Sequence, residues 1–157
     1  MTFEQVTKMI KSLKTQLNML VITGGEPFIR KDLYEICSAF YKINNTKRIN
    51  IVTNGLLGTK ILDTVTRLVT ENPEKRLTIV VSLDGLEKTH NEIRRVPNIW
   101  KKDIELINDL KKIAEQHSNL SLFVNLTMTK TNINEVKSLS KYVKEELKIN
   151  FKVNVLR

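Results

Sequence analysis

The sequence predicts an α/β domain built around a parallel sheet of about five strands. Short runs of Val, Ile and Leu alternate along the 157 residues with longer segments in which apolar residues recur every three or four positions. Regular alternation of strands and helices is typical of parallel strands joined by right-handed crossovers. The strand runs are mostly apolar, which favours a sheet that is covered on both faces.

The boundaries of the elements follow from apolar spacing and from helix-capping pairs. In chain order, we expect a helix over 3–17, a strand over 19–23, a helix from 32, a strand over 49–53, a helix around 61–68, a strand over 77–83, a helix over 100–117, a strand over 120–128, a helix from 132 to 147 and a strand over 151–156. Polar pairs three residues apart predict caps at three helix starts: Thr2 with Gln5, Asp32 with Glu35, and Asn132 with Glu135.

Composition and charge limit the classes of function. Hydrophobic residues make up 41% and charged residues 27% of the chain, as in ordinary globular proteins. No apolar run approaches the ~20 residues of a membrane span, and the N-terminus lacks the pattern of a signal peptide. We therefore expect one cytoplasmic domain without a membrane partner. The net charge is +9, but Lys and Arg are mixed with acidic residues and form no basic block, so we do not expect nucleic-acid binding.

Cys37 is the only cysteine in the sequence. One thiol cannot form an internal disulfide bond or a multi-cysteine metal site. Cys37 lies among apolar residues of the helix that begins at 32, and this position predicts a small core residue. The sequence therefore offers no metal-ligating residue.

Polar residues gather where the predicted strands end. In parallel α/β folds, ligands bind at the C-terminal ends of the strands. The candidate binding residues, in chain order, are Gly24, Gly25 and Glu26 after the first strand, Asn54 after the second, Ser82 and Asp84 at the third, Arg94 shortly beyond it, and Asn125 and Thr127 at the fourth.

Five of these candidates have a specific chemical interpretation. Gly24 and Gly25 lack a Cβ, so a ligand can approach and bind their backbone. Glu26 is an anion suited to an ammonium group, and Arg94 offers a planar fork for a carboxylate. The carboxylate of Asp84 suits a ribose diol. An ammonium, a carboxylate and a ribose together describe S-adenosylmethionine.

The other candidates are polar but less specific. Ser82 supplies a hydroxyl group, and Asn54, Asn125 and Thr127 can hydrogen-bond a heterocycle or a polar substrate. Taken singly, Gly-Gly, Asn-Gly and Asp-Gly are common turn sequences. Order and position distinguish the set, because Gly-Gly-Glu, Thr-Asn-Gly and Ser-Leu-Asp-Gly each end a predicted parallel strand.

Four further residues are predicted to have structural rather than ligand-binding roles. His90 and His117 are predicted to be surface or helix-cap residues rather than ligands. Arg95 and Trp100 are predicted to be surface and packing residues. No residue is predicted to be catalytic.

With these motifs the sequence resembles the radical S-adenosylmethionine (radical SAM) enzyme family, and within it the sulfatase-maturing and peptide-modifying branch. The segments ITGGEPFIRKDL, IVTNG, VSLDGLEKTHNEIRRVPN and VNLTMTKTN carry the resemblance. The resemblance implies a partial TIM-type (β/α)6 barrel whose first strand is missing. Residues 1–157 would then form a single incomplete radical SAM core domain.

The resemblance also implies roles for the candidate residues. The Gly-Gly-Glu motif would face the amino group of S-adenosylmethionine, and Ser82 and Arg94 would lie near its carboxylate or ribose. Asp84 fits the same motif or stabilises the turn, while Asn125 and Thr127 match a polar position on the family's fifth barrel strand. The implied chemistry is reductive cleavage of S-adenosylmethionine to a 5′-deoxyadenosyl radical, which abstracts a hydrogen from a substrate.

The sequence departs from the family at one essential point. Members hold a [4Fe–4S] cluster with a CxxxCxxC loop after their first strand, and the ligands of this cluster are absent here. We therefore expect a fragment of a radical SAM enzyme that binds S-adenosylmethionine and is inactive by itself. The alternative is a non-catalytic module of the same fold that binds S-adenosylmethionine or a peptide.

Three further expectations complete the sequence analysis. An unrelated nucleotide-binding protein is disfavoured, because neither a P-loop nor GxGxxG follows a strand. The strand over 19–23 lacks a preceding neighbour, which predicts an unpaired edge and self-association. The substrate, a small molecule or a peptide, is not identified by the sequence.

Overall fold

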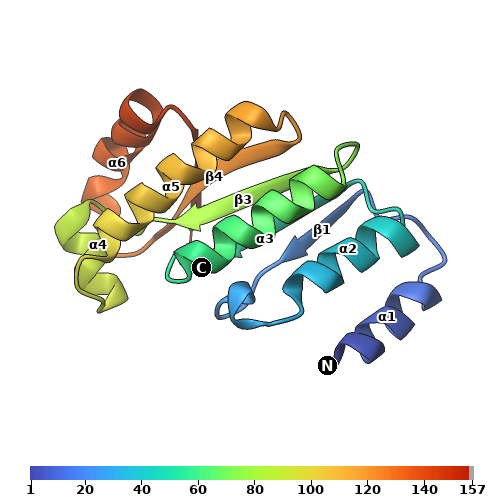
Figure 1. The fold of residues 1–157 in the computed structure, drawn as a ribbon. Helices are drawn as coiled ribbons and strands as arrows, with labels where there is room; N and C mark the ends of the chain where they lie inside the picture. Colours follow the sequence, from blue (N-terminus) through green and yellow to red (C-terminus); the bar gives the residue numbers. More distant parts are fainter. Residues whose placement is uncertain (156–157) are drawn as a thin grey trace.

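The computed structural model of the chain describes residues 1–155 (Figure 1). Its helices are α1 (Phe3–Ser12), α2 (Leu33–Ile43), α3 (Gly58–Glu71), α4 (Glu87–Arg94), α5 (Ile99–Gln116) and α6 (Val136–Tyr142). Its strands are β1 (Met19–Ile22), β2 (Arg48–Thr53), β3 (Arg76–Ser82), β4 (Leu120–Met128) and β5 (Asn150–Val155). Short 3₁₀ turns cover Pro27–Ile29 and Ile133–Glu135, and a π-helical turn covers Val143–Leu147.

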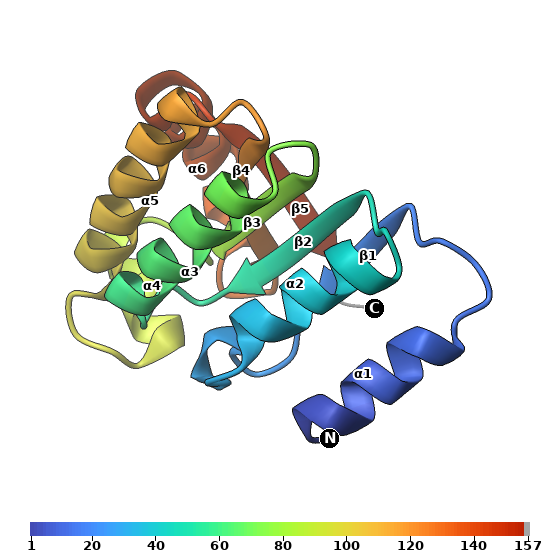
Figure 2. The same ribbon diagram turned by 45° about the vertical axis from the view of Figure 1, so that its right-hand side comes forward.

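The strands form one parallel sheet in the order β1-β2-β3-β4-β5. Because strands that follow one another in sequence are also neighbours in the sheet, right-handed crossovers place their helices on the same face. Figure 2 shows α2, α3 and α5 side by side against that face, with α1 outside α2. The predicted α/β class and the five-stranded parallel sheet are confirmed.

The core lies between the helices and the sheet. Alternate strand residues point into it and are almost fully buried, among them Ile49, Ile51, Ile79, Val124 and Leu126. Complete burial of one aliphatic side chain stabilises a fold by ~1.5–3 kcal/mol. This apolar layer therefore fixes the strand register, and with it the positions of the strand ends.

The opposite face of the sheet differs from the expectation. The apolar strands predicted a sheet covered on both faces, whereas the helices within residues 1–155 cover one face (Figure 2). On the other face, Met19 and Val21 are each 50% exposed, and Val80 and Phe123 are half-buried. The prediction was wrong because neighbouring strands partly shield such apolar residues from water without a second helical layer.

The helices differ from the prediction in their boundaries. α1 ends at Ser12 rather than at 17, and α4 is absent from the prediction. The helix expected over 132–147 divides into a 3₁₀ turn, α6 and the π-helical turn. β5 ends at Val155, and position 156 of the predicted strand lies outside the described residues.

One of the three predicted caps forms as expected. The Thr2 hydroxyl accepts from the Gln5 N–H at 3.3 Å, and the Gln5 side chain accepts from the Thr2 N–H at 2.9 Å. Asp32 makes no cap hydrogen bond and instead forms an ion pair with Arg30 at 2.8 Å. The third cap, at Asn132, is replaced by contacts within the candidate site described below.

Candidate functional site

The candidate residues lie at the C-terminal edge of the parallel sheet. Because all five strands run in the same direction, their C-terminal ends meet at this edge. The β1, β2 and β3 ends bring the first three motifs together, and the end of β4 lies beside them. α4 follows β3 and returns Arg94 to the same region, as its contact with Asp84 shows.

Glu26 ties the end of β1 to the end of β2. Its Oε1 accepts hydrogen bonds from the Phe28 N–H at 3.1 Å and from the Thr53 hydroxyl at 2.9 Å. Its Oε2 accepts from the Asn54 N–H at 2.7 Å. Because a carboxylate offers about four lone-pair sites, Glu26 retains capacity for a further donor. Sequence reasoning identified Glu26 but missed its partner Thr53.

The two glycines before Glu26 form the open part of the site. Gly24 and Gly25 are exposed, and a Cβ placed on either would meet no heavy atom within 4 Å. Gly24 has φ +146°, a conformation that side-chain-bearing residues rarely adopt. The backbone here is accessible to a ligand, while its role toward an amino group remains a prediction.

Asn54 stabilises the turn after β2. Its side-chain Oδ1 accepts from the Leu56 N–H at 3.0 Å, which closes a local turn. Its backbone N–H is the donor to Glu26. The side-chain oxygen is therefore engaged, and the predicted contact of Asn54 with a heterocycle stays untested.

Asp84 is the most connected residue of the site. Its Oδ2 lies 2.8 Å from an Arg94 guanidinium nitrogen, and its Oδ1 accepts from the Thr127 N–H at 3.3 Å. Its backbone N–H donates to His90 at 3.0 Å, and its carbonyl oxygen accepts from the Asn132 side chain at 2.9 Å. Asp84 thus joins β3, α4 and β4, as expected for a residue that stabilises the turn.

Arg94 uses only part of its guanidinium group on Asp84. The buried Nε of Arg94 has no hydrogen-bond partner among the described residues. A buried charged donor without a partner is unfavourable by several kcal/mol in an apolar medium. Arg94 therefore has an unused donor at the strand edge, in keeping with its predicted contact with an anionic group.

Ser82, Asn125 and Thr127 lie on the sheet face that the helices leave open. Ser82 and Asn125 are direct neighbours across β3 and β4, and Thr127 lies two residues further along β4. Asn125 is 5% exposed, and its Oδ1 has no hydrogen-bond partner among residues 1–155. Asn125 thus holds a buried acceptor without a partner beside the open face, as Arg94 holds a buried donor without a partner near the strand edge.

His90 is fully buried, and the prediction of a surface or helix-cap residue was wrong. Its Nδ1 accepts from the Asp84 N–H at 3.0 Å, and its Nε2 lies 2.9 Å from Oδ2 of Asp103. The Trp100 ring packs against the imidazole edge with 5.9 Å between ring centroids. The sequence pattern hid this arrangement because the partners of His90 lie on other elements.

Asp103 is a site residue that sequence reasoning missed. It is fully buried on α5, and burial raises the pKa of its carboxyl group, an effect that the hydrogen bond to His90 opposes. A signal was present, because Asp103 lies three residues after Trp100 and four before Ile107, on the apolar stripe of α5. A lone carboxylate on such a stripe indicates a buried polar partner.

Gly55 makes room for Asp103. A Cβ at Gly55 would lie 1.8 Å from the Oδ1 of Asp103, and the residue has φ +80°. The Gly55 N–H donates to the Thr53 hydroxyl at 3.2 Å. The Thr-Asn-Gly motif therefore connects the Glu26 side of the site to the Asp103 side.

Asn132 and Glu135 brace the loop after β3 instead of capping their own helix. The fully buried Asn132 side chain donates to the carbonyl oxygens of Asp84 and Thr127, both at 2.9 Å. Glu135 accepts from the Leu86 N–H at 2.7 Å and from the Thr89 hydroxyl at 2.6 Å. The predicted cap at Asn132 was wrong because its Oδ1 accepts from the Thr129 N–H at 2.7 Å, and its amide nitrogen donates to the two carbonyl oxygens.

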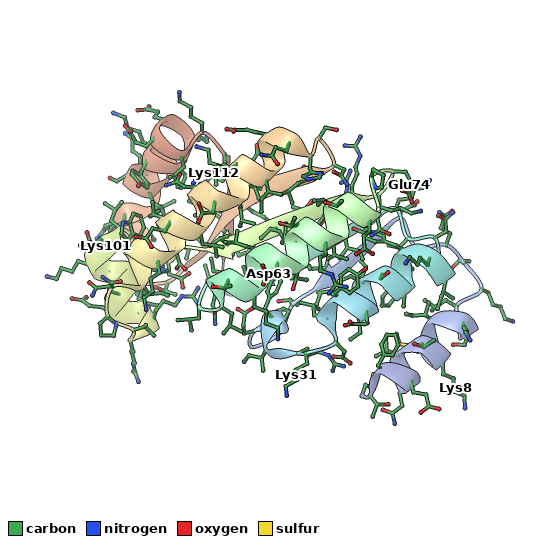
Figure 3. All side chains as sticks on the ribbon, in the orientation of Figure 1. Lys8, Lys31, Asp63, Glu74, Lys101 and Lys112 are labelled. Carbon is green, nitrogen blue, oxygen red and sulfur yellow. The ribbon has the colours of Figure 1, made fainter. Side chains whose placement is uncertain are left out.

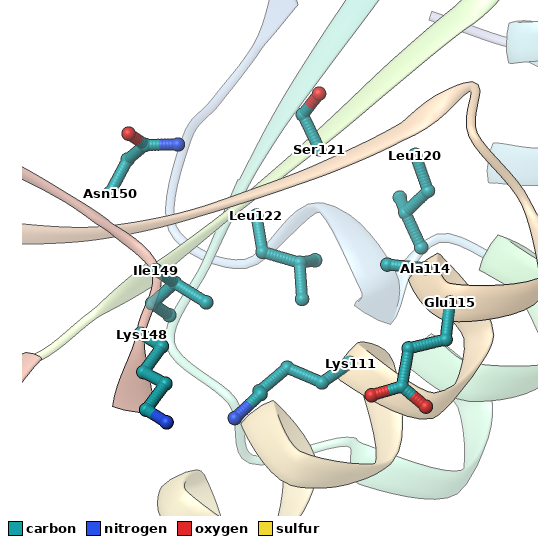
Figure 4. Close-up of a pocket in the computed structure, with 9 residues that line it drawn as sticks. All are labelled: Lys111, Ala114, Glu115, Leu120, Ser121, Leu122, Lys148, Ile149 and Asn150. Carbon is teal, nitrogen blue, oxygen red and sulfur yellow. The ribbon is translucent and has the colours of Figure 1, made fainter. Parts of the chain in front are cut away.

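A separate pocket lies at the other end of the sheet. It has a volume of about 370 Å³ and is formed by α5 and by the start of β4 and β5 (Figure 4). Lys111 and Lys148 lie at its rim, and Leu122 and Ile149 form its apolar wall. It contains none of the candidate residues, so it is distinct from the site at the C-terminal strand ends.

The residues of the site do not fit an iron–sulfur cluster. Cys37 is buried in α2, and burial raises the pKa of its thiol to about 12, which disfavours a thiolate ligand. Among residues 1–155, no group of three or more His, Cys, Asp or Glu side chains is arranged to hold a metal ion. In the same range, no helix has the length and apolarity needed to cross a membrane.

Comparison with known proteins identifies the family to which the chain belongs. A parallel sheet with helices on one face and polar groups along its C-terminal edge is typical of the βα-barrel class. The model of the Radical SAM superfamily matches residues 1–143. The chain therefore belongs to the Radical SAM superfamily, a family of enzymes.

Two curated relatives illustrate the similarity. The AdoMet-dependent heme synthase of Methanosarcina barkeri is 29% identical over 128 residues, which are 81% of this chain and 33% of the relative. The GTP 3′,8-cyclase of Staphylococcus haemolyticus is 31% identical over 103 residues, 62% of this chain and 26% of the relative. The chain thus spans a third or less of the length of these relatives.

A solved structure supports the fold. The chain matches tagged anSMEcpe with bound AdoMet at a TM-score of 0.70 and 17% identity, over 99% of this chain and 43% of that one. The five-stranded sheet therefore corresponds to part of a radical SAM barrel, as the sequence predicts.

Proposed function

We propose that this chain binds S-adenosylmethionine as part of a radical SAM enzyme whose complete form holds a [4Fe–4S] cluster. One observation carries the proposal: Arg94 near the C-terminal edge of the sheet has a buried donor without a partner, Asn125 beside the open face has a buried acceptor without a partner, and the same edge exposes the backbone of Gly24 and Gly25. A zwitterionic cofactor with a polar base needs both kinds of group. Membership of the superfamily supports this identity of the ligand.

Most of the candidate residues have a role in the proposal. The backbone at Gly24 and Gly25 binds the amino group, with Glu26 close to that positive charge. The guanidinium group of Arg94 binds the carboxylate or the ribose, and Ser82 lies on the same side. Polar side chains of β4 contact the remainder of the ligand.

The reaction of the complete enzyme is part of the same proposal. With a reduced cluster, the bound cofactor supplies a 5′-deoxyadenosyl radical for hydrogen abstraction from a substrate. The residues of this chain do not fit the cluster, so we expect the chain alone to bind S-adenosylmethionine without cleaving it. The relatives named above carry different activities in their names, so their substrates do not transfer to this chain.

Titration calorimetry of the purified chain with S-adenosylmethionine tests the binding. We expect heat of binding in the wild type and affinity about 10–100-fold lower in Arg94→Ala, because a hydrogen bond to a charged group contributes about 1.5–3 kcal/mol. Arg67→Ala is the matched control, since Arg67 lies on α3 against Tyr34 and away from the strand edge. Absence of binding heat in the folded wild type at millimolar ligand would overturn the proposal.

The second candidate is a non-catalytic module of the same fold. Cys37 favours this candidate, because it is buried and the sequence has no other cysteine to ligate a cluster. Adding a chain that carries a CxxxCxxC loop separates the two functions. Cleavage of S-adenosylmethionine by the reconstituted pair supports the enzyme, and binding without cleavage supports the module.

The charges on the molecular surface bear on the class of substrate. Charged side chains such as Lys101 and Lys112 project outward from the helices, and acidic residues such as Asp63 and Glu74 lie among the basic ones (Figure 3). This mixture supports a small-molecule or peptide substrate rather than a nucleic acid. We also propose a cytoplasmic location without a membrane partner.

A further inference from the structure

Behind the candidate site lies a buried pair of titratable residues, His90 and Asp103. Both side chains are 0% exposed, and the imidazole Nε2 lies 2.9 Å from the Asp103 carboxylate. Neither residue reaches the exposed glycines or the open face of the sheet. The binding role proposed above therefore leaves the pair without an assigned task.

The hydrogen bonds define the protonation of His90. The backbone N–H of Asp84 is a donor, so Nδ1 of His90 must be the unprotonated acceptor. The ring proton then lies on Nε2 and is donated to Asp103. Asp103 thus holds His90 in the one neutral tautomer that can accept from Asp84.

Stability alone does not account for this pair. Oδ1 of Asp103 has no hydrogen-bond partner among the described residues, and a Cβ at Gly55 would lie 1.8 Å from it. Apolar residues of similar volume are often as stable as a buried polar pair, or more so. Because this carboxylate is only half-satisfied, we look for its role in the geometry that it fixes rather than in stability.

The chain of contacts leads from α5 to Arg94. Asp103 on α5 holds His90, His90 holds the backbone of Asp84, and the Asp84 carboxylate holds Arg94 at 2.8 Å. Thr127 and Asn132 fix Asp84 from the β4 side. His90 connects Asp84 and its contacts to Asp103 on α5.

We propose that His90 and Asp103 are positioning residues that set where the Arg94 guanidinium meets the carboxylate-bearing end of the ligand. This inference rests on the function proposed above, takes the carboxylate rather than the ribose as the partner of Arg94, and adds two residues that touch no ligand atom. Their effect is specific to one end of the ligand. We expect the groups that contact the nucleoside end to depend on them much less.

Two ligands separate positioning from general support of the fold. S-adenosylmethionine carries the amino-acid end, whereas 5′-methylthioadenosine keeps the nucleoside and lacks the ammonium and carboxylate. We expect His90→Phe to lower the affinity for S-adenosylmethionine at least tenfold and the affinity for 5′-methylthioadenosine less than twofold. Trp100→Phe is the matched control, because it alters the packing beside His90 and leaves the hydrogen bonds in place.

A double-mutant cycle with Arg94→Ala gives the sharper result. If His90 acts through Arg94, His90→Phe has no further effect on S-adenosylmethionine affinity once Arg94 is alanine. Additive losses, or equal losses for both ligands, would overturn the positioning role while leaving the proposed function intact. A wild type that binds neither ligand overturns both.

Conservative variants keep the test informative where His90→Phe fails to fold. In His90→Asn the side-chain oxygen can replace Nδ1 and accept from Asp84, and in His90→Gln the side-chain amide can replace Nε2 and donate to Asp103. We expect His90→Asn to retain more affinity for S-adenosylmethionine than His90→Gln. The reverse order would contradict the proposal, since it would make the Asp103 contact, not the Asp84 contact, the one that matters.

Discussion

The two sides of the candidate site are built differently. On the β3–β4 side, Asp84 contacts His90, Arg94, Thr127 and Asn132, and its exposed fraction is 8%. On the β1 side, the glycines are exposed with nothing near them, and the Glu26 carboxylate is the link to β2. The first side is preformed, and the second is open.

Because of this difference, the two sides are expected to have different roles toward a ligand. A preformed polar network loses little freedom when a ligand binds, and its groups are already in place. An open backbone segment with few contacts has lower local stability and can adapt. For the proposed ligand, we therefore expect the β3–β4 side to orient it and the β1 side to admit it.

Substitution of glycines on the two sides is expected to give the largest contrast. Gly55→Ala should lower the free energy of unfolding by about 3 kcal/mol or more, since the new Cβ collides with the fixed carboxylate of Asp103 and φ is positive. Gly25→Ala should change it by less than about 1 kcal/mol, because the site around it is open. Urea denaturation measures the free energy of unfolding of both variants. Equal losses would contradict the distinction between a preformed side and an open side.

Removing the hydrogen bond between Thr53 and Glu26 is expected to have a smaller effect on stability. Thr53→Val keeps the shape but removes the hydroxyl that donates to Glu26 and accepts from Gly55, so it should destabilise the chain by about 1–2 kcal/mol. Thr78→Val is the control, a buried β3 threonine for which the structure records no side-chain hydrogen bond within residues 1–155. Equal losses in the two variants would mean that the hydroxyl contacts do not stabilise the link.

The pH dependence of stability should distinguish the buried carboxylate from an exposed one. Burial raises the pKa of Asp103 above its usual value of 3.8, so the folded state binds the proton more tightly than the unfolded state. The stability of the wild type relative to Asp103→Asn should therefore fall as pH rises from 3.8 through the raised pKa.

Asp32 supplies the control of opposite sign. Arg30 lowers the pKa of Asp32 below 3.8, so the contribution of its carboxylate should be lost as pH falls through that range. Its size should be small because the pair is partly exposed. Denaturation between pH 3 and pH 6 measures both trends, and the same sign for both would contradict the assignment.

Self-association through β1 is the weakest expected effect. β1 pairs with β2 on one side, and no pairing is recorded on its other edge among the described residues. Val21→Lys places a charge on this exposed strand and should reduce association, while Ile133→Lys, beside the ends of β4 and β5 and away from the β1 edge, should not. Light scattering measures it, and a monodisperse wild-type monomer would refute the predicted association.

The sheet was predictable because its signal is local. Runs such as residues 77–83 and 120–128 are apolar enough to identify strands within about one residue, and parallel order follows from the alternation with helices. Motif position then placed Glu26, Asp84 and Arg94 at one edge of the sheet. Their binding of S-adenosylmethionine stays a prediction.

The parts that sequence reasoning missed depend on long-range partners. α4 carries His90 and Ile93 among mostly polar residues, so its apolar period is too weak to indicate a helix. His90 and Asn132 were misplaced because each finds its partners on another element. A polar side chain shows its type in the sequence but not whether a distant group will satisfy it after burial.

Backbone amide NMR during titration with S-adenosylmethionine tests the central claim most directly, since the chain of 18.2 kDa suits the method. The account predicts shifts at Gly24, Gly25, Ser82 and Thr127, with the largest changes on the open β1 side. Signals of the pocket in Figure 4 should stay unchanged. Shifts confined to that pocket, or no shifts at saturating ligand, would contradict a binding site at the C-terminal edge of the sheet.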